Sequence, residues 1–204
     1  MKNENLKAAV GLILAILLGL GVALAGSTGS VRVAGMPLFM MLVALAYLIQ
    51  WLAFIPAFIF QTEKFYDLTG SITYITLLIL AILLSPLIDA RSLLLLILVL
   101  IWAGRLGSFL VRRVHRAGKD GRFDSIKTGF IRFLSAWSLQ ALWITFTISA
   151  ALVAVTSVHR QEPGIFALVG TLIWLCGFSL EAIADRQKNR FRADPANRGK
   201  FITT

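Results

Sequence analysis

The sequence predicts an all-α integral membrane protein, a polytopic bundle of about six transmembrane helices. Of its 204 residues, 58% are hydrophobic and 15% are charged, whereas a soluble domain is about 45–50% apolar and roughly 25% charged. The hydrophobic residues gather in blocks of about 17–25, and about 20 helical residues cross a bilayer core. Because hydrocarbon offers the backbone no hydrogen-bond partners, each block is expected to be a helix.

We interpret the whole chain, 1–204, as one membrane domain. The predicted spans are residues 8–25, 36–60, 72–88, 92–111, 133–155 and 164–183. A basic loop at 112–132 and a tail at 184–204 hold most of the other residues. Pro56 and Pro86 fall within the second and third spans, where each removes a backbone donor and is expected to kink its helix.

The first span has a second interpretation. Lys2 and Lys7 precede an apolar run that ends at Ala23-Leu24-Ala25, a pattern that is also typical of a signal peptide and its cleavage site. The run is long for a signal peptide and other spans follow it, so a retained helix is favoured. The topology of the remaining chain is the same in both cases.

Positive charge lies mostly on one side of the predicted bundle. With the six spans in place, 16 of the 20 Lys and Arg residues fall on the side of the N-terminus. Arg32, Arg91 and Arg160 fall on the other side, and Arg105 lies within the fourth span. Because cytoplasmic loops are rich in Lys and Arg, both termini are predicted to be cytoplasmic. Topology and anionic lipid then explain the net charge of +10, and no nucleic acid is expected as a partner.

Few residues of the chain are suited to a metal centre. Cys176 is the single cysteine and lies in an apolar block, while His115 and His159 lie in predicted loops. We therefore expect no metal site and no disulfide framework.

The basic loop carries more charge than topology requires. Its arginine and lysine side chains, with glycines between them, suit phosphate oxygens, as in a dinucleotide. A polybasic loop lying against lipid headgroups has the same composition. Asp120 and Asp124 favour the phosphate site, because acids add nothing to a lipid-binding patch. The candidate cations are Arg113, Arg116, Lys119 and Arg122.

A second polar group begins at the end of the sixth span. Four residues at positions i, i+4, i+8 and i+11 fall on one face of a helix. Such a face offers acceptors to ribose hydroxyls or an amide and a cation to phosphate, although an ordinary solvated helix end reads the same way. The four residues are Glu181, Asp185, Asn189 and Arg192.

Polar residues also lie within and between the other spans. Gln50 and Gln140 are expected to hydrogen-bond between helices, and Arg105 is a functional candidate because an ionisable group inside a membrane is costly. Glu63 and Tyr66, three residues apart after the second span, form a candidate pair. A partly buried glutamic acid with a raised pKa donates a proton, and with the tyrosine it would polarise a carbonyl oxygen. A charged interfacial turn is the alternative.

Several segments together resemble a known family. They are TEKFYDLTG at 62–70, RLG at 105–107, GKDGRFD at 118–124, EAIADRQK at 181–188 and NRGKF at 197–201. From the second span onward the chain resembles the DUF1295 family, within the steroid 5α-reductase-like membrane enzymes.

The resemblance implies an NADPH-dependent reductase that adds hydride to a carbon–carbon double bond conjugated to a carbonyl. Its substrate would be a lipid or a steroid-like enone that enters from the bilayer, and its site would open to the cytoplasm of a bacterial inner membrane. The resemblance assigns Glu63 and Tyr66 as the polarising pair. The resemblance also implies a set of residues that contact the cofactor: Arg105, Arg113, Arg116, Lys119, Arg122, Glu181, Asp185, Asn189 and Arg192.

The chain departs from the family pattern at two places. Trp102 stands three residues before Arg105, where the steroid reductases have a tyrosine. The family also continues into a segment that closes over the cofactor, so we expect this chain, which ends at Thr204, to be truncated and weakly active. Two other functions stay open: an isoprenylcysteine-methyltransferase-like enzyme using S-adenosylmethionine, and a non-catalytic bundle that binds lipid or a partner.

The charge asymmetry predicts where the C-terminus lies. A fluorescent protein fused after Thr204 is expected to fluoresce, and a phosphatase active only outside the cytoplasm is expected to be inactive there. The same two reporters fused after Arg32 should give the opposite result. A phosphatase-active C-terminal fusion would contradict the predicted orientation.

Overall fold

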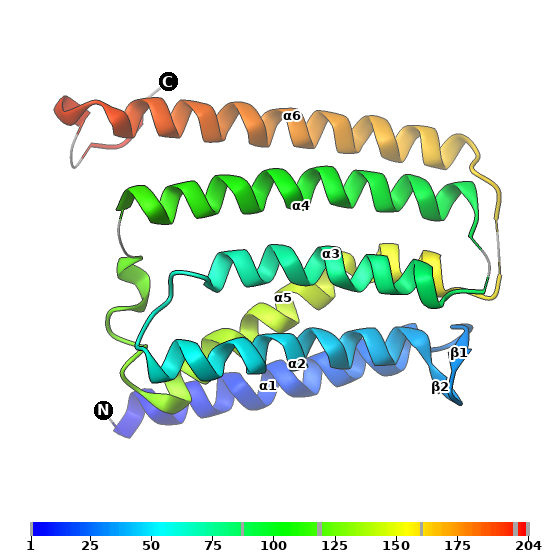
Figure 1. Ribbon diagram of the computed structural model, residues 1–204, viewed down its shortest axis with the longest axis horizontal. Helices are drawn as coiled ribbons and strands as arrows, with labels where there is room; N and C mark the ends of the chain where they lie inside the picture. The colour runs from blue at the N-terminus through cyan, green and yellow to red at the C-terminus, as the bar shows by residue number, and fades with distance from the viewer. Residues whose placement is uncertain (1, 87, 118–119, 160, 198–199, 203–204) are drawn as a thin grey trace. The chain divides into compact units, whose positions relative to one another are not determined.

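The structure is a computed structural model that describes residues 2–86, 88–117, 120–159, 161–197 and 200–202. Its main elements are six long helices, as the hydrophobic blocks predict (Figure 1). They are α1 (Lys2–Gly26), α2 (Leu38–Ile59), α3 (Tyr66–Leu84), α4 (Ala90–Ala117), α5 (Phe130–Thr156) and α6 (Ile165–Ala193). In the described part of the chain, these six helices are long and apolar enough to cross a membrane. The all-α polytopic fold class is confirmed.

Short elements join the helices. The strands β1 (Arg32–Val33) and β2 (Met36–Pro37) pair antiparallel around Ala34 and Gly35, which both have positive φ as a tight hairpin turn requires. Two 3-10 turns, η1 (Gly121–Phe123) and η2 (Pro195–Asn197), follow α4 and α6.

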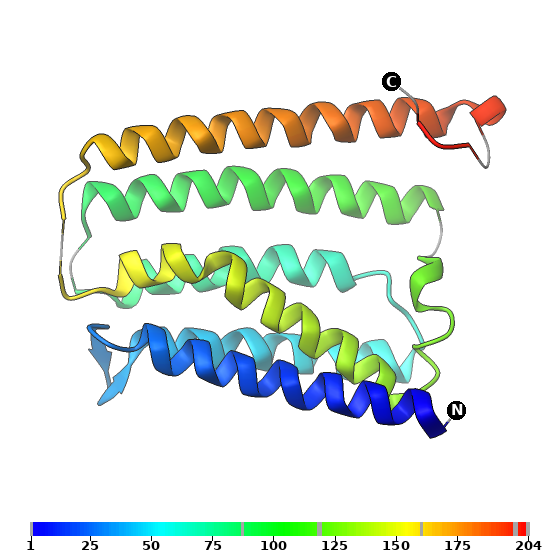
Figure 2. The ribbon, with the colours of Figure 1, turned by 180° about the vertical axis from the view of Figure 1, so that it is seen from behind.

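The chain divides into two compact units, residues 1–161 and 162–204. The first unit holds α1 to α5, and α5 contacts each of the other four helices and crosses them obliquely (Figure 1, Figure 2). The second unit is α6 with η2. The interpretation of the chain as one membrane domain stays a prediction.

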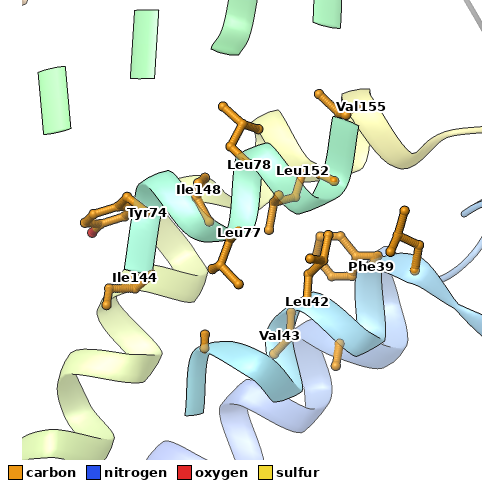
Figure 3. Close-up of a cluster of buried hydrophobic side chains, with 14 of the residues drawn as sticks. Phe39, Leu42, Val43, Tyr74, Leu77, Leu78, Ile144, Ile148, Leu152 and Val155 are labelled. Carbon is orange, nitrogen blue, oxygen red and sulfur yellow. The ribbon is translucent and has the colours of Figure 1, made fainter. Parts of the chain in front are cut away.

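Three helices supply the centre of the first unit. Side chains of α2, α3 and α5 interdigitate there, with bulky aliphatic residues at helical spacing on each (Figure 3). The cluster includes Phe39, Leu42 and Val43 of α2, Tyr74, Leu77 and Leu78 of α3, and Ile144, Ile148, Leu152 and Val155 of α5. Polar side chains cross the same interface: Gln50 Nε2 donates to Thr73 Oγ1 at 2.9 Å, and Gln140 Nε2 donates to the Tyr66 carbonyl at 3.0 Å. The predicted interhelical role of both glutamines is confirmed.

Some predicted helix ends are wrong. The third helix begins at Tyr66 and ends at Leu84 rather than spanning 72–88. It begins early because Asp67, in its first turn, lies close to the positive end of the helix dipole and has a cationic partner. Pro86 therefore follows α3 and does not kink it; Ser85 before it is extended, as a residue preceding proline prefers. Pro56 does lie inside α2.

Small residues of α1 allow it to pack closely against its neighbours. A Cβ added to Gly19 would meet the Tyr47 ring, and one added to Gly26 would meet Phe39. The Tyr47 hydroxyl donates to the Ala15 carbonyl, which an aliphatic side chain at Gly19 would obstruct. The interpretation of α1 as a retained span stays a prediction.

The contact predicts different effects for two glycines on the same helix. Gly19→Ala is expected to lower the free energy of unfolding by about 1–3 kcal/mol, because the added methyl group overpacks against Tyr47. Gly21→Ala is the matched control, since its Cβ would meet nothing within 4 Å, and it should be neutral or stabilising. Thermal unfolding in detergent micelles measures both. Equal losses for the two variants would contradict the packing of α1.

Candidate functional site

Glu63 lies in the short connection between α2 and α3, and its side chain is only 2% exposed. Its Oε2 accepts a hydrogen bond from Lys127 Nζ at 2.9 Å, and its Oε1 accepts one from the backbone N–H of Asp120 at 3.0 Å. Lys127 also lies 3.7 Å from Asp124. One carboxylate therefore fixes the segment between α4 and α5 to the start of α3.

This geometry corrects the proposed acid role of Glu63. Desolvation by burial acts to raise the pKa of Glu63, but the hydrogen bonds from Lys127 and the Asp120 N–H outweigh it. The pKa of Glu63 is lowered, not raised, and the hydrogen bond to Glu63 in turn raises the pKa of Lys127. Glu63 is therefore ionised at neutral pH and has no proton to donate.

A ring of alternating charges lies beside Glu63. Arg113 of α4 contacts Asp67 of α3 at 2.9 Å and Asp120 at 3.8 Å. Arg122 forms a fork with Asp120, with Nε 3.0 Å from Oδ1 and 2.9 Å from Oδ2, and its Nη2 lies 4.0 Å from Asp67. Hydrogen bonding to Arg122 lowers the pKa of Asp120, so this carboxylate is ionised at neutral pH. The ring links the start of α3, the end of α4 and η1.

Tyr66 lies in the first turn of α3, not in a loop, and points toward α5. Its hydroxyl donates to the Ala136 carbonyl at 2.9 Å, and its ring lies 4.8 Å from Phe123 and 4.9 Å from Trp137, between ring centroids. The side chains of Glu63 and Tyr66 thus engage separate partners. The assignment of Tyr66 to polarise a carbonyl stays a prediction, whereas the ionised Glu63 does not fit the proton-donating part of the pair.

The other predicted cations of the first unit lie along or after α4. Arg105 is partly buried within α4, as expected for the fourth span. Arg116 lies in the last turn of the same helix, but its side chain lies outside the described residues. Lys119 lies outside them altogether.

The predicted polar face of the second unit lies on one unbroken helix. Because α6 continues to Ala193, its four polar residues keep the spacing that places them on one face. Glu181 and Asp185 are partly buried, while Asn189 and Arg192 are exposed.

A hollow of about 670 Å³ lies at the end of this helix, where the chain turns back after η2. Three cations, one acid and two aromatic rings are among its lining residues, so positively charged side chains outnumber negatively charged ones there. These residues are Lys188, Arg192, Lys200, Asp194, Phe191 and Phe201.

The family model described as "Protein of unknown function (DUF1295)" matches residues 53–204. The chain belongs to the DUF1295 family. No curated protein and no solved structure matches it.

The DUF1295 match begins within α2 and includes the Glu63 cluster, the charge ring and the α6 face. In the described part of this DUF1295 chain, no group of three His, Cys, Asp or Glu residues is placed to hold a metal ion.

Several residues of these clusters are not apparent from local sequence patterns. Asp67 and Lys127 have partners that lie 46 and 64 residues away, and no local pattern joins them. Lys188 had a local signal, since it precedes Arg192 by one helical turn.

The Glu63–Lys127 pair predicts a pH-dependent contribution to stability. Glu63→Gln is expected to lower the free energy of unfolding by about 1–3 kcal/mol at pH 7, because a charged hydrogen bond is lost. The lowered pKa of Glu63 means that this contribution is present above its ordinary pKa of 4.5 and is lost as the pH falls through the lowered value. The raised pKa of Lys127 preserves it up to the ordinary lysine value of 10.5 and beyond.

Thermal unfolding of wild type and Glu63→Gln between pH 3 and pH 9 measures the effect. The double variant Glu63→Gln/Lys127→Met is the control, and it should recover part of the loss because no buried charge is left without its partner; Asp124, which also lies near Lys127, is exposed. A stability gap that stays the same at pH 3 as at pH 7 would rule out the ionised pair.

Proposed function

We propose that this protein is a membrane-embedded, NADPH-dependent reductase of a lipid or steroid-like enone. The observation that carries the proposal is the basic hollow at the end of α6, next to a helical face of acids, amide and arginine. Resemblance to the steroid 5α-reductase-like enzymes supplies the reaction class.

The donor set of the hollow fits the polar parts of a dinucleotide. Lys188, Arg192 and Lys200 carry the N–H donors that phosphate oxygens accept. Asp194 in the hollow and Asn189 on the adjoining face of α6 carry side-chain oxygens that suit ribose hydroxyls or an amide. Phe191 offers an apolar surface beside these groups. In this proposal these residues hold the cofactor. Asp185 and Glu181, which precede Asn189 on α6 by about one and two helical turns, extend the same polar face.

NADPH supplies the hydride when it is bound. The resemblance assigns Tyr66 to polarise the substrate carbonyl, and its hydroxyl would do so by giving up its hydrogen bond to the Ala136 carbonyl. Glu63 is assigned a positioning role instead of proton donation, because it stays ionised and holds the segment that carries Asp120 and Lys127.

Cofactor binding tests the proposal directly. Purified protein in a zwitterionic detergent is titrated with NADPH, and saturable enhancement of nicotinamide fluorescence is expected. Arg192→Ala should weaken binding roughly tenfold, as expected for one charged hydrogen bond. Arg190→Ala is the matched control: it is exposed on the same helix with the same charge, and it does not line the hollow. Absence of saturable binding, or saturable binding of S-adenosylmethionine in its place, would overturn the proposal.

Asp185→Asn separates a cofactor site from a lipid-binding patch. Loss of an acid should strengthen adsorption to anionic vesicles by simple charge attraction. A dinucleotide site that uses the carboxylate as an acceptor should instead lose affinity for NADPH. Unchanged NADPH affinity with stronger vesicle binding would favour the non-catalytic bundle.

A further inference from the structure

The side chain of Arg122 is unusual because it is exposed to solvent and yet fixed by several contacts. Its side chain is 64% exposed, yet its Nε and Nη2 form a fork with the Asp120 carboxylate and its guanidinium lies 5.7 Å from the centroid of the Phe123 ring. Phe123 is itself buried among Tyr66 and Phe133, so this ring is a fixed surface. An exposed arginine normally loses entropy when it is ordered in this way and gains little from a surface ion pair.

The neighbouring Arg113 is held differently. Its side chain is 33% exposed and lies between two carboxylates, at 2.9 Å from Asp67 and 3.8 Å from Asp120. The shortest contact of Arg113 is therefore the one to Asp67, which joins α4 to α3. Arg122 approaches Asp67 only at 4.0 Å, so among the described residues the edge of its guanidinium away from Asp120 has no comparably close carboxylate.

Asp120 is fixed in turn by Glu63. Its backbone N–H donates to Glu63 Oε1 at 3.0 Å, and its own Oδ1 accepts the backbone N–H of Arg122 at 3.1 Å. The chain of contacts runs from a buried carboxylate, through Asp120, to an exposed guanidinium. A binding group that is ordered beforehand loses less entropy when its ligand arrives.

We propose that Arg122 contacts a phosphate group directly and that Asp120 is the positioning residue that presents its guanidinium. The ligand is a phosphate ester, carried either by a soluble nucleotide or by a lipid headgroup. The nucleotide source rests on the proposed reductase function, whereas the lipid source does not. Arg113 serves to connect α3 and α4 and does not contact the ligand.

The substitution Asp120→Asn distinguishes positioning from bulk electrostatics by the sign of its effect. Removal of a negative charge beside an anion site should strengthen phosphate binding if charge alone matters. Loss of the fork should weaken it if Asp120 orders Arg122, and we expect a fall in affinity of about three- to tenfold. Asp120→Glu keeps the carboxylate and should retain more affinity than Asp120→Asn. Thermal unfolding of each variant confirms that it is folded.

A double-mutant cycle with Arg122→Ala tests whether Asp120 acts through the arginine. Arg122→Ala should weaken binding roughly tenfold, and adding Asp120→Asn should then cause no further loss. Arg112→Ala is the control: Arg112 is exposed near the end of α4 and bonds only to Ser108 among the contacts in the described residues. It should behave as wild type.

Two arms identify the phosphate source. In zwitterionic detergent the probes are NADPH and inorganic pyrophosphate. In vesicles, binding to phosphatidylcholine with and without phosphatidylglycerol is compared. Failure of NADPH to bind any variant defeats the reductase function, but a cycle in the pyrophosphate or phosphatidylglycerol arm still supports the arginine site. The inference is overturned if Asp120→Asn strengthens or leaves unchanged the binding of every probe, or if its effect persists in the Arg122→Ala background.

Discussion

The lack of hydrogen-bond partners in hydrocarbon is the constraint on which the rest of this structure depends. It requires every spanning segment to be a helix, and it requires polar side chains within the spans to find partners in protein. Gln50 does so on Thr73, and Gln140 on the carbonyl of Tyr66. The apolar side chains of α2, α3 and α5 fill the space between these bonds. Close packing replaces the hydrophobic effect as the source of cohesion between helices.

The same constraint concentrates charge outside the spans. Acids and bases confined to a few short segments lie close together, where a dielectric below that of water strengthens their attraction: two unit charges 4 Å apart gain about 1 kcal/mol in water but about 4 kcal/mol at an effective dielectric constant of 20. Glu63 and Lys127 form the most buried of the pairs among the described residues. Asp67 and Arg113 connect the ends of α3 and α4. The ends of the helices are thus joined by ion pairs while their middles are joined by packing.

These ion pairs distinguish the cations of the basic loop from one another as candidate binding groups. Its cations are not equivalent, because the carboxylates that accompany them engage some more completely than others. Arg113 is used to hold the fold, and Arg122 is ordered but remains accessible. The α6 unit presents a second basic surface of its own, at a hollow that includes Arg192 and Lys200. The DUF1295 match includes both regions. In the reductase proposal both would bind phosphate groups.

The sequence by itself determined the number of helices, their approximate positions and the continuous polar face of α6. These follow from hydropathy and helical spacing, which are local properties of the chain. Only the tertiary structure decided that Glu63 is a paired carboxylate instead of an acid. Its pKa depends on Lys127, which is 64 residues away. The Asp67–Arg113 pair at the start of α3 likewise joins residues 46 positions apart. Burial and charge pairing act between distant residues, so no local pattern specified them.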